Sequence, residues 1–216
     1  MRIPIIGSGG REHAIAGSFA RSPKVRKIFV SPGNAGIGQY YPLLPFISFE
    51  ETVKQVHEHK IDIVFIGPEQ YLADGIVDYL EKHGIKVVGP SQKAARLESS
   101  KIFAKNLMQK LHIPTASHKE FYHLDEALRY SAYCAYPQVV KADGLAAGKG
   151  VRIVQSPIEA KYCLDEMMNT LKYGNAGKSV IMEEFLEGWE ASVFAFCDGL
   201  QFQTTIFAQD HKRLLD

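Results

Sequence analysis

The sequence predicts an α/β protein in which a doubly wound parallel sheet is followed by a region of α+β character. The first observation is that short apolar strands alternate with amphipathic helices over roughly the first 90 residues, the order of a parallel sheet covered by helices. The second is a change after Ile113–Pro114, where strands are expected to pair around glycine-rich turns. The boundary between the two parts is therefore expected near residues 113–118.

Composition limits the possible classes of protein. The chain has 216 residues with 46% hydrophobic and 23% charged side chains, values typical of a soluble globular protein. A net charge of +1 gives no reason to expect nucleic acid as a partner. Three distant cysteines without metal-ligand spacing favour a reducing compartment. No apolar run would serve as a signal peptide or membrane span, so we expect a cytoplasmic protein without a membrane partner.

A strand at 3–6, a glycine-rich turn and a helix at 12–20 open the chain. This order is typical of a phosphate- or nucleotide-binding unit, because the turn aims backbone N–H groups at a ligand and Arg11 adds a forked cation. The dinucleotide fingerprint G-x-G-x-x-G is not met, since Glu12 occupies its third glycine position. For this turn alone, a phosphate site and an ordinary strand–helix connection both stay open.

The rest of the first part repeats the pattern, with strands predicted at 27–30, 61–66 and 85–88 and helices around 49–56 and 76–80. Polar glycine-containing loops follow these strands, at Ser31–Gly36, Gly67–Glu69 and Gly89–Pro90. Ligands bind at the carboxyl ends of strands in open α/β sheets, so the loops indicate one crevice. A single longer helix is then predicted at 93–111. Lys101 and Lys105 share one face of it, for which a solvated pair is the plainer interpretation.

The strand at 137–141 runs into a loop with three glycines and a lysine, followed by a second strand at 151–154. Glycines let backbone N–H groups turn toward a ligand, and lysines supply charge for phosphate oxygens, so the loop predicts a flap over a polyphosphate. A Walker A loop is rejected, because the spacing is one residue short and a strand follows. The alternative is a glycine-rich hairpin with a solvated lysine. Helices at 125–133 and 157–168, a strand at 179–184 and a hairpin around Asp198–Gly199 complete the second part.

Eight segments occur in an order that identifies a family: GSGGREHAIA (7–16), SPGNAG (31–36), IGPEQYLADGIVD (66–78), VVGPSQKAARLESSKIFAK (87–105), IPTA (113–116), VVKADGLAAGKGV (139–151), EEFLEGWEAS (183–192) and AQDHKR (208–213). Together they resemble the phosphoribosylamine–glycine ligases, ATP-grasp enzymes of purine biosynthesis. The resemblance covers the whole chain. It implies a substrate domain with a connecting helix at 1–112, a small lid subdomain at 113–190 and the start of a larger ATP-grasp subdomain at 191–216.

The resemblance also implies roles for individual residues. Those that would hold phosphoribosylamine are Gly9, Gly10, Arg11, Glu12, Asn34, Pro68 and Glu69. Those that would bind ATP are Lys101 and Lys141 at the phosphates, Gly144, Gly148, Lys149 and Gly150 in the flap, Glu183, Glu184, Phe185 and Leu186 around the adenine, and Glu190 at the ribose. Catalytic residues would be Lys141 and, on the substrate side, Asp210, His211, Lys212 and Arg213.

The implied reaction uses ATP, glycine and phosphoribosylamine, with glycyl phosphate as intermediate, and Mg²⁺ or Mn²⁺ as cofactor. The metal ligands are expected beyond residue 216, so this chain is expected to be an N-terminal fragment that is inactive alone, and a monomer or weak dimer. Two alternatives stay open, a non-catalytic ATP-binding module and another ATP-grasp ligase. A Rossmann dehydrogenase is disfavoured by Glu12 and by the second glycine loop.

Overall fold

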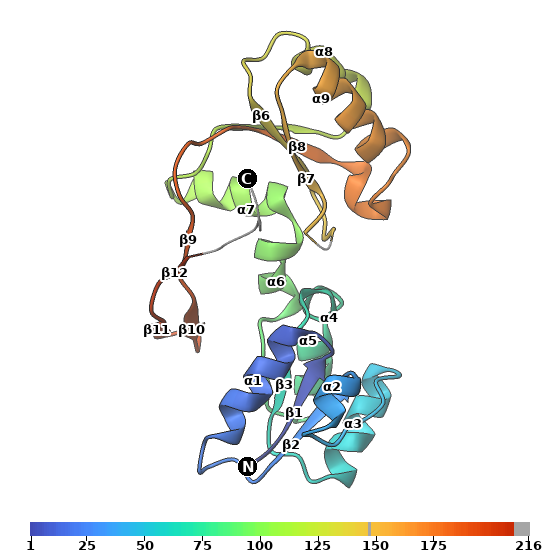
Figure 1. Cartoon of the computed structure of the whole chain (residues 1–216), viewed down its shortest axis with the longest axis vertical. Helices are drawn as coiled ribbons and strands as arrows, with labels where there is room; N and C mark the ends of the chain where they lie inside the picture. Colours follow the sequence, from blue (N-terminus) through green and yellow to red (C-terminus); the bar gives the residue numbers. More distant parts are fainter. Residues whose placement is uncertain (147, 210–216) are drawn as a thin grey trace.

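The computed structural model describes residues 1–146 and 148–209. It is elongated, with the N-terminal sheet at one end and a second sheet at the other, and helices α6 and α7 lie between them (Figure 1). No helix in these described ranges is long and apolar enough to cross a bilayer.

The N-terminal sheet has four parallel strands in the order β2-β1-β3-β4, as the sequence predicts. The strands are β1 (Arg2–Gly7), β2 (Lys27–Pro32), β3 (Val64–Ile66) and β4 (Val87–Val88). The helices are α1 (Gly10–Ala20), α2 (Ala35–Gly38), α3 (Phe49–Glu58), α4 (Glu69–Ala73) and α5 (Ile76–Lys82).

The central strand β1 shows why this sheet is covered on both faces. Successive side chains of a strand point to opposite faces, so Ile5 and Ile6 enter different cores. Ile5 packs with Ala16 of α1, whereas Ile6 packs with Leu80 of α5. Both isoleucines are buried, which fits a run of apolar residues without polar alternation. The order 2-1-3-4 places a reversal of strand order at β1 and β3, and the loops after these strands therefore open a crevice at the carboxyl edge.

The single helix predicted at 93–111 is wrong. The segment forms two helices, α6 (Gln92–Ser99) and α7 (Lys101–Lys110), with Ser100 between them in an extended conformation (φ −139°, ψ 111°). The Ser100 hydroxyl accepts a hydrogen bond from Phe103 N at 3.1 Å and donates to the Asp143 carboxylate. Serine competes with the helix for backbone hydrogen bonds and favours the cap position, which starts a new helix here.

The second sheet has four antiparallel strands in the order β5-β8-β6-β7, which confirms the predicted change of character. The strands are β5 (His118–Phe121), β6 (Gln138–Ala142), β7 (Val151–Val154) and β8 (Val180–Glu184). One face is covered by α8 (Leu124–Ser131) and by α9 (Pro157–Leu164), which continues as a π-helix over Asp165–Asn169 before a short 3₁₀ helix at Gly174–Lys178.

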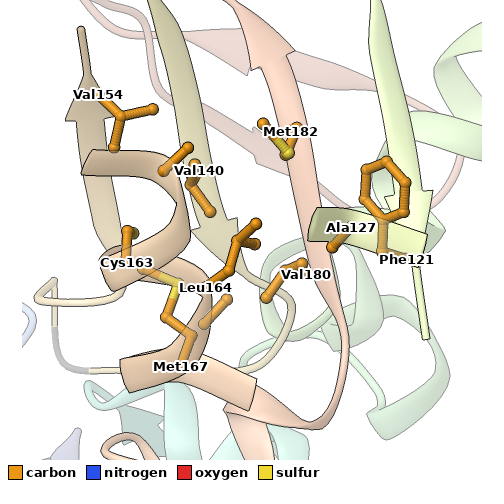
Figure 2. Close-up of a cluster of buried hydrophobic side chains, with 11 residues drawn as sticks. Phe121, Ala127, Val140, Val154, Cys163, Leu164, Met167, Val180 and Met182 are labelled. Carbon is orange, nitrogen blue, oxygen red and sulfur yellow. The ribbon is translucent and has the colours of Figure 1, made fainter. Parts of the chain in front are cut away.

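Figure 2 shows the core beneath these helices, where Leu164 of α9 lies toward Val140 and Val180 of the sheet. Residues that alternate with Val140 and Met182 point to the opposite face. That face carries Lys141 on β6 and Glu183 on β8. The sheet thus presents an apolar side to its helices and a charged side to the space near α7.

The described chain ends in small hairpins that extend away from the second sheet, to the left of α7 and α6 in Figure 1. Strand β9 (Ala191–Ser192) pairs with β12 (Ala208–Gln209), and β10 (Ala195–Cys197) pairs with β11 (Phe202–Thr204) around the predicted Asp198–Gly199 turn.

Candidate functional site

Loops at the carboxyl edge of the first sheet bring Arg11 and Glu69 together. Arg11, at the start of α1, donates from Nη1 to Glu69 Oε1 at 2.7 Å and from Nη2 to the Gly67 carbonyl at 2.9 Å. The Arg11 hydrogen bond is the main reason why the pKa of Glu69 lies below its ordinary value of 4.5. Strands β1 and β3 are neighbours, and their parallel direction brings both loops to one edge. We call this group, with Gly9, Gly10, Glu12 and Asn34, the carboxyl-edge site.

Glu12 is the buried anchor of this site, with 3% of its surface exposed. Its Oε2 accepts a hydrogen bond from Gly9 N at 2.7 Å, and its Oε1 pairs with Arg11 Nε at 3.1 Å. Gly7 and Gly67 flank the side chain, and a Cβ on either would overlap it. The residue that breaks the dinucleotide fingerprint therefore fills the space between two strand ends and fixes the turn.

Asn34 connects the loop after β2 to the loop after β1. Its Nδ2 donates to the Ser8 carbonyl at 2.6 Å, and its Oδ1 caps α2 by accepting from Ile37 N at 3.0 Å. Nothing described outside the helix backbone lies within 4 Å of a Cβ built on Gly10, so no side chain covers the α-carbon at the start of α1. The first N–H groups of a helix have no partner within the helix, and this end of α1 can therefore receive an anion.

The charged face of the second sheet brings two lysines onto one carboxylate. Glu183 Oε2 lies 2.8 Å from Lys141 Nζ of β6 and 3.2 Å from Lys105 Nζ of α7. Lys105 also donates to Thr115 Oγ1 at 2.8 Å and to the Ala116 carbonyl at 3.1 Å. Glu183 is 4% exposed and Lys105 is 8% exposed, so this is a largely buried group with an excess of positive charge.

Lys101 lies one turn earlier on α7 and reaches the base of the glycine flap. Its Nζ donates to the Gly144 carbonyl at 3.0 Å, and burial lowers its pKa from 10.5. Asp143 fixes this arrangement, because its Oδ1 accepts from Ile102 N at 2.8 Å while its carbonyl accepts from Lys101 N at 3.2 Å. The solvated-face interpretation is therefore wrong for both Lys101 and Lys105.

A cavity of about 710 Å³, which we call the lysine groove, lies over the charged face of the sheet. Its polar wall contains Lys101, Lys105, Lys141 and Glu183, and its apolar wall contains Val139, Ile153 and Met108. Predicted residues at one end of the groove are Glu184, Phe185, Leu186 and Glu190. Glu184 Oε1 accepts from Ser117 N at 2.7 Å, which ties the end of β8 to the segment before β5. An apolar slot with converging cations suits a ligand with a flat ring and phosphates.

A second cavity of about 780 Å³, the bridging pocket, lies between the lysine groove and the loop that carries Glu69. The two cavities share Glu98, Lys101 and Val151. The bridging pocket is also lined by Pro68 and Glu69, which follow β3, and by Gly148 and Gly150 from the flap. The shared walls place the bridging pocket beside the lysine groove, and Pro68 and Glu69 place it beside the carboxyl-edge site.

The flap connects β6 to β7, which pair antiparallel as predicted. Gly148 has φ +74°, a conformation that favours glycine, and a Cβ on Gly144 would come within 2.8 Å of Ala176 Cβ. Gly150 is packed against Ala142 and Ala146 in the same way. Lys149 is exposed and lines neither cavity. Backbone conformation and close packing therefore account for the flap glycines. Lys149 does not lie with the other lysines.

Two functional candidates were missed from sequence. The sequence favours a solvated position for Lys105, although its spacing of four from Lys101 places both on the same helix face. Asp143 follows Lys141 by two residues, and nothing in its local sequence indicated that it would bind the start of α7. The predicted residues Asp210, His211, Lys212 and Arg213 lie outside the described residues.

Metal ligands can be tested only within residues 1–146 and 148–209. No three His, Cys, Asp or Glu side chains converge there as a metal site requires. Glu183, the buried carboxylate of the lysine groove, is already paired with two ammonium groups. The described residues therefore do not fit a metal, and a metal site elsewhere stays a prediction.

The fold and the two sites define an ATP-grasp protein. Residues 1–98 match the family model described as the phosphoribosylglycinamide synthetase N domain, and residues 99–216 match that of the ATP-grasp (A) domain of the same synthetase. The chain belongs to the phosphoribosylglycinamide synthetase family.

Similar proteins agree with this assignment. A phosphoribosylamine–glycine ligase of Caldanaerobacter subterraneus subsp. tengcongensis is 48% identical, over 100% of this chain and 52% of that protein. The crystal structure of a phosphoribosylamine–glycine ligase from Thermotoga maritima has a TM-score of 0.83 and 33% identity, over 100% of this chain and 52% of that chain. A biotin carboxylase domain from Hydrogenobacter thermophilus shares the fold at 17% identity, with a TM-score of 0.70 over 90% of this chain and 46% of that one. The chain spans about half the length of the curated relatives that it matches.

Proposed function

We propose that this chain supplies the nucleotide groove and the amine-substrate site of a ligase that joins glycine to 5-phosphoribosylamine with ATP. The observation that carries the proposal is the bridging pocket, which shares Glu98, Lys101 and Val151 with the lysine-lined groove and is also lined by Pro68 and Glu69 of the parallel sheet's loops. A ligase of this kind must bring a phosphoryl donor and an amine acceptor into one space, and this geometry supports that requirement.

ATP would lie in the lysine groove. The adenine would enter between the apolar residues of β6 and β7 and the Phe185–Leu186 segment, and Glu190 would accept from the ribose hydroxyls. Lys105 and Lys141 would neutralise phosphate oxygens, because Glu183 balances only one of their two charges while it holds both ammonium groups in place. Lys101 and the flap backbone would reach the phosphates nearest the bridging pocket.

Phosphoribosylamine would lie at the carboxyl-edge site. Its phosphate would bind backbone N–H groups at the start of α1, where no side chain covers the Gly10 α-carbon. The Arg11 guanidinium already donates to Glu12, Glu69 and the Gly67 carbonyl, so we assign it to positioning Glu69. The Glu69 carboxylate would then accept from the hydroxyls or the amine of the sugar, with Pro68 and Asn34 shaping the loops around it.

The reaction would proceed in two balanced steps. A glycine carboxylate oxygen attacks the γ-phosphorus of ATP, and ADP leaves as glycyl phosphate forms. The amine of phosphoribosylamine then attacks the glycyl carbonyl, and inorganic phosphate leaves as the amide bond forms. The described residues contribute positioning and charge neutralisation, and closure of the flap would exclude water that would hydrolyse the acyl phosphate.

The test is ATP binding by this chain, measured by calorimetry, together with ligation by the native-length protein. Lys141→Ala is expected to weaken ATP binding at least tenfold, because it removes roughly 1.4 kcal/mol or more of phosphate contact. Lys105→Met is expected to weaken ATP binding by removing a positive charge from the groove wall, since its three N–H groups already bind Thr115, Ala116 and Glu183. Lys161→Ala, an exposed lysine on the outer helix α9, is the control and should bind ATP as the unsubstituted chain does.

Ligation is measured as phosphate release that depends on both glycine and phosphoribosylamine. Unchanged ATP affinity in both groove variants would refute the nucleotide assignment. ATP binding without release of phosphate by the native-length protein would refute the ligase and favour a binding module.

A further inference from the structure

A second groove lies on the opposite edge of the first sheet, at the amino ends of its strands. All four strands contribute to its wall: Arg2 begins β1, Arg26 precedes β2, Asp62 lies before β3, and Lys86 precedes β4. The space has a volume of about 900 Å³. We call it the amino-edge groove. It lies at the end of the molecule marked by the N-terminus in Figure 1, away from the second sheet.

The groove concentrates positive charge. Its lining contains the side chains of Arg2, Lys24, Arg26, Lys60 and Lys86. Asp62 is the one carboxylate among the described residues that line it, and its Oδ2 is occupied by Arg2 N at 2.7 Å. The chain as a whole carries a net charge of only +1, so five basic side chains around one cavity are a local feature.

Four of these five basic side chains have no polar partner in the described ranges. Arg2 donates from Nη1 to the His59 carbonyl at 2.9 Å and so closes the end of α3. Within residues 1–146 and 148–209, the side chains of Lys24, Arg26, Lys60 and Lys86 make no hydrogen bond or ion pair. Like charges held around one cavity repel each other, and a bound anion would relieve that repulsion.

Helix C-termini neutralise only part of this positive charge. Helices α1, α3 and α5 end on this edge, and a helix C-terminus carries about half a negative charge. Three such ends and Asp62 together offset about two and a half of the five positive charges. At least two positive charges are left without a counter-charge from the protein.

We propose that the amino-edge groove binds a compact anion that carries two or more phosphates. The volume is that of a small-molecule site. No aromatic side chain lines the groove among the described residues, so it offers no platform for bases and does not favour single-stranded nucleic acid. Recognition would rest on phosphate oxygens, for which arginine supplies a fork and lysine a point charge. This anion would bind at the edge of the sheet opposite the candidate nucleotide and amine sites.

The experiment uses inorganic tripolyphosphate as the probe and the backbone amide signals of the whole 216-residue chain as the readout. Salt is kept at about 0.15 M, where charges beyond ~8 Å are screened. Saturable shifts are expected for amides of residues 24–27, 60–62 and 85–87, whether or not the lysine groove also binds the probe. The result is therefore independent of the proposed function.

Two triple variants remove the same charge. Lys24→Gln/Lys60→Gln/Lys86→Gln changes the groove, and Lys110→Gln/Lys161→Gln/Lys178→Gln changes exposed lysines elsewhere. The groove variant should weaken tripolyphosphate binding at these amides at least about tenfold, whereas the control should not change it. Unshifted signals outside the substituted residues show that both variants are folded. Absence of saturable shifts, equal weakening in both variants, or tighter binding of a single-stranded oligonucleotide than of tripolyphosphate would overturn the proposal.

Discussion

At the carboxyl-edge site a guanidinium is shared between two carboxylates, and in the lysine groove a carboxylate is shared between two ammonium groups. Arg11 contacts Glu12 and Glu69, so the first group carries a net negative charge. Glu183 contacts Lys105 and Lys141, so the second carries a net positive charge. Both groups are built from three residues, yet they leave opposite charges for a ligand.

The opposite net charges of the two sites favour different ligand groups. An anionic triphosphate is favoured where ammonium groups exceed carboxylates, while a carboxylate held by arginine suits hydroxyl and amine donors. A phosphate at the carboxyl-edge site must therefore rely on the backbone at the start of α1.

The largest effect is expected from Lys105→Met. The substitution removes one partner of the buried Glu183, whose Oε1 already lacks a hydrogen bond among the described atoms. Glu183 keeps Lys141, but three hydrogen bonds from the Lys105 ammonium are lost, to Glu183, Thr115 and Ala116, each worth about 1.5–3 kcal/mol, so the free energy of unfolding should fall by about 3 kcal/mol or more. The measurement is urea unfolding followed by fluorescence. The matched variant Lys105→Met/Glu183→Leu removes both charges and should recover part of the loss, and a larger loss in the double variant would contradict the buried-pair explanation.

Gly67→Ala tests the tightness of the carboxyl-edge site. A Cβ at this position would overlap the Glu12 carboxylate, which cannot move without losing Gly9 N and Arg11 Nε. Overpacking of this kind costs about 1–3 kcal/mol. Gly17→Ala, a helical position with nothing within 4 Å of the added Cβ, should be neutral or stabilising. Thermal unfolding of the two variants compares them, and equal melting temperatures would show that Glu12 is free to move.

Asp143→Ala separates the flap base from α7. The change removes the acceptor for Ile102 N and for the Ser100 hydroxyl, at a cost of about 1–2 kcal/mol. Faster hydrogen exchange is expected at the amides of 101–103 and 144–146, with those of β1 unaffected. Unchanged exchange at both segments would mean that Asp143 does not hold them together.

The smallest effect concerns pH and Arg11→Met. Arg11 holds the pKa of Glu69 below its ordinary value of 4.5, so the pair stabilises the fold above that pH. This contribution is lost as pH falls through the lowered pKa of Glu69. Both side chains are about half exposed, so the contribution is below about 1 kcal/mol. NMR titration of the Glu69 carboxyl should give a higher pKa in Arg11→Met, and an unchanged pKa would show that the ion pair does not form in solution.

Sequence alone predicted the first sheet well, because its strands are continuous apolar runs and each ends in a glycine turn. The helix at 93–111 failed for a physical reason: its apolar spacing continues through Ser100, while the break depends on Asp143, which lies more than forty positions further along the chain. Periodicity reports local burial and cannot report such a partner.

The same limit applies to the candidate sites. The flap glycines and Lys141 form a motif that the sequence shows directly. The sequence does not show that Lys105 is the buried lysine of α7, because Lys101 and Lys105 share a helix face and differ only in what packs over them. Glu12 was recognised as the residue that breaks a fingerprint. Its hydrogen bond with Gly9 N is local, whereas its contact with Gly67 emerges only when β1 and β3 become neighbours.

The bonds of Asp143 also determine which parts can move as one body. They attach the first turn of α7 to the flap strand, and Lys105 attaches the middle of α7 to β8. A rotation of the second sheet that preserves these bonds must carry α7 along with it. The torsion would then fall at Ser99–Ser100, beside the junction of the two family matches at residues 98 and 99. Under the proposed function, such a rotation would carry Lys101 and Lys105 together with the second sheet relative to the carboxyl-edge site.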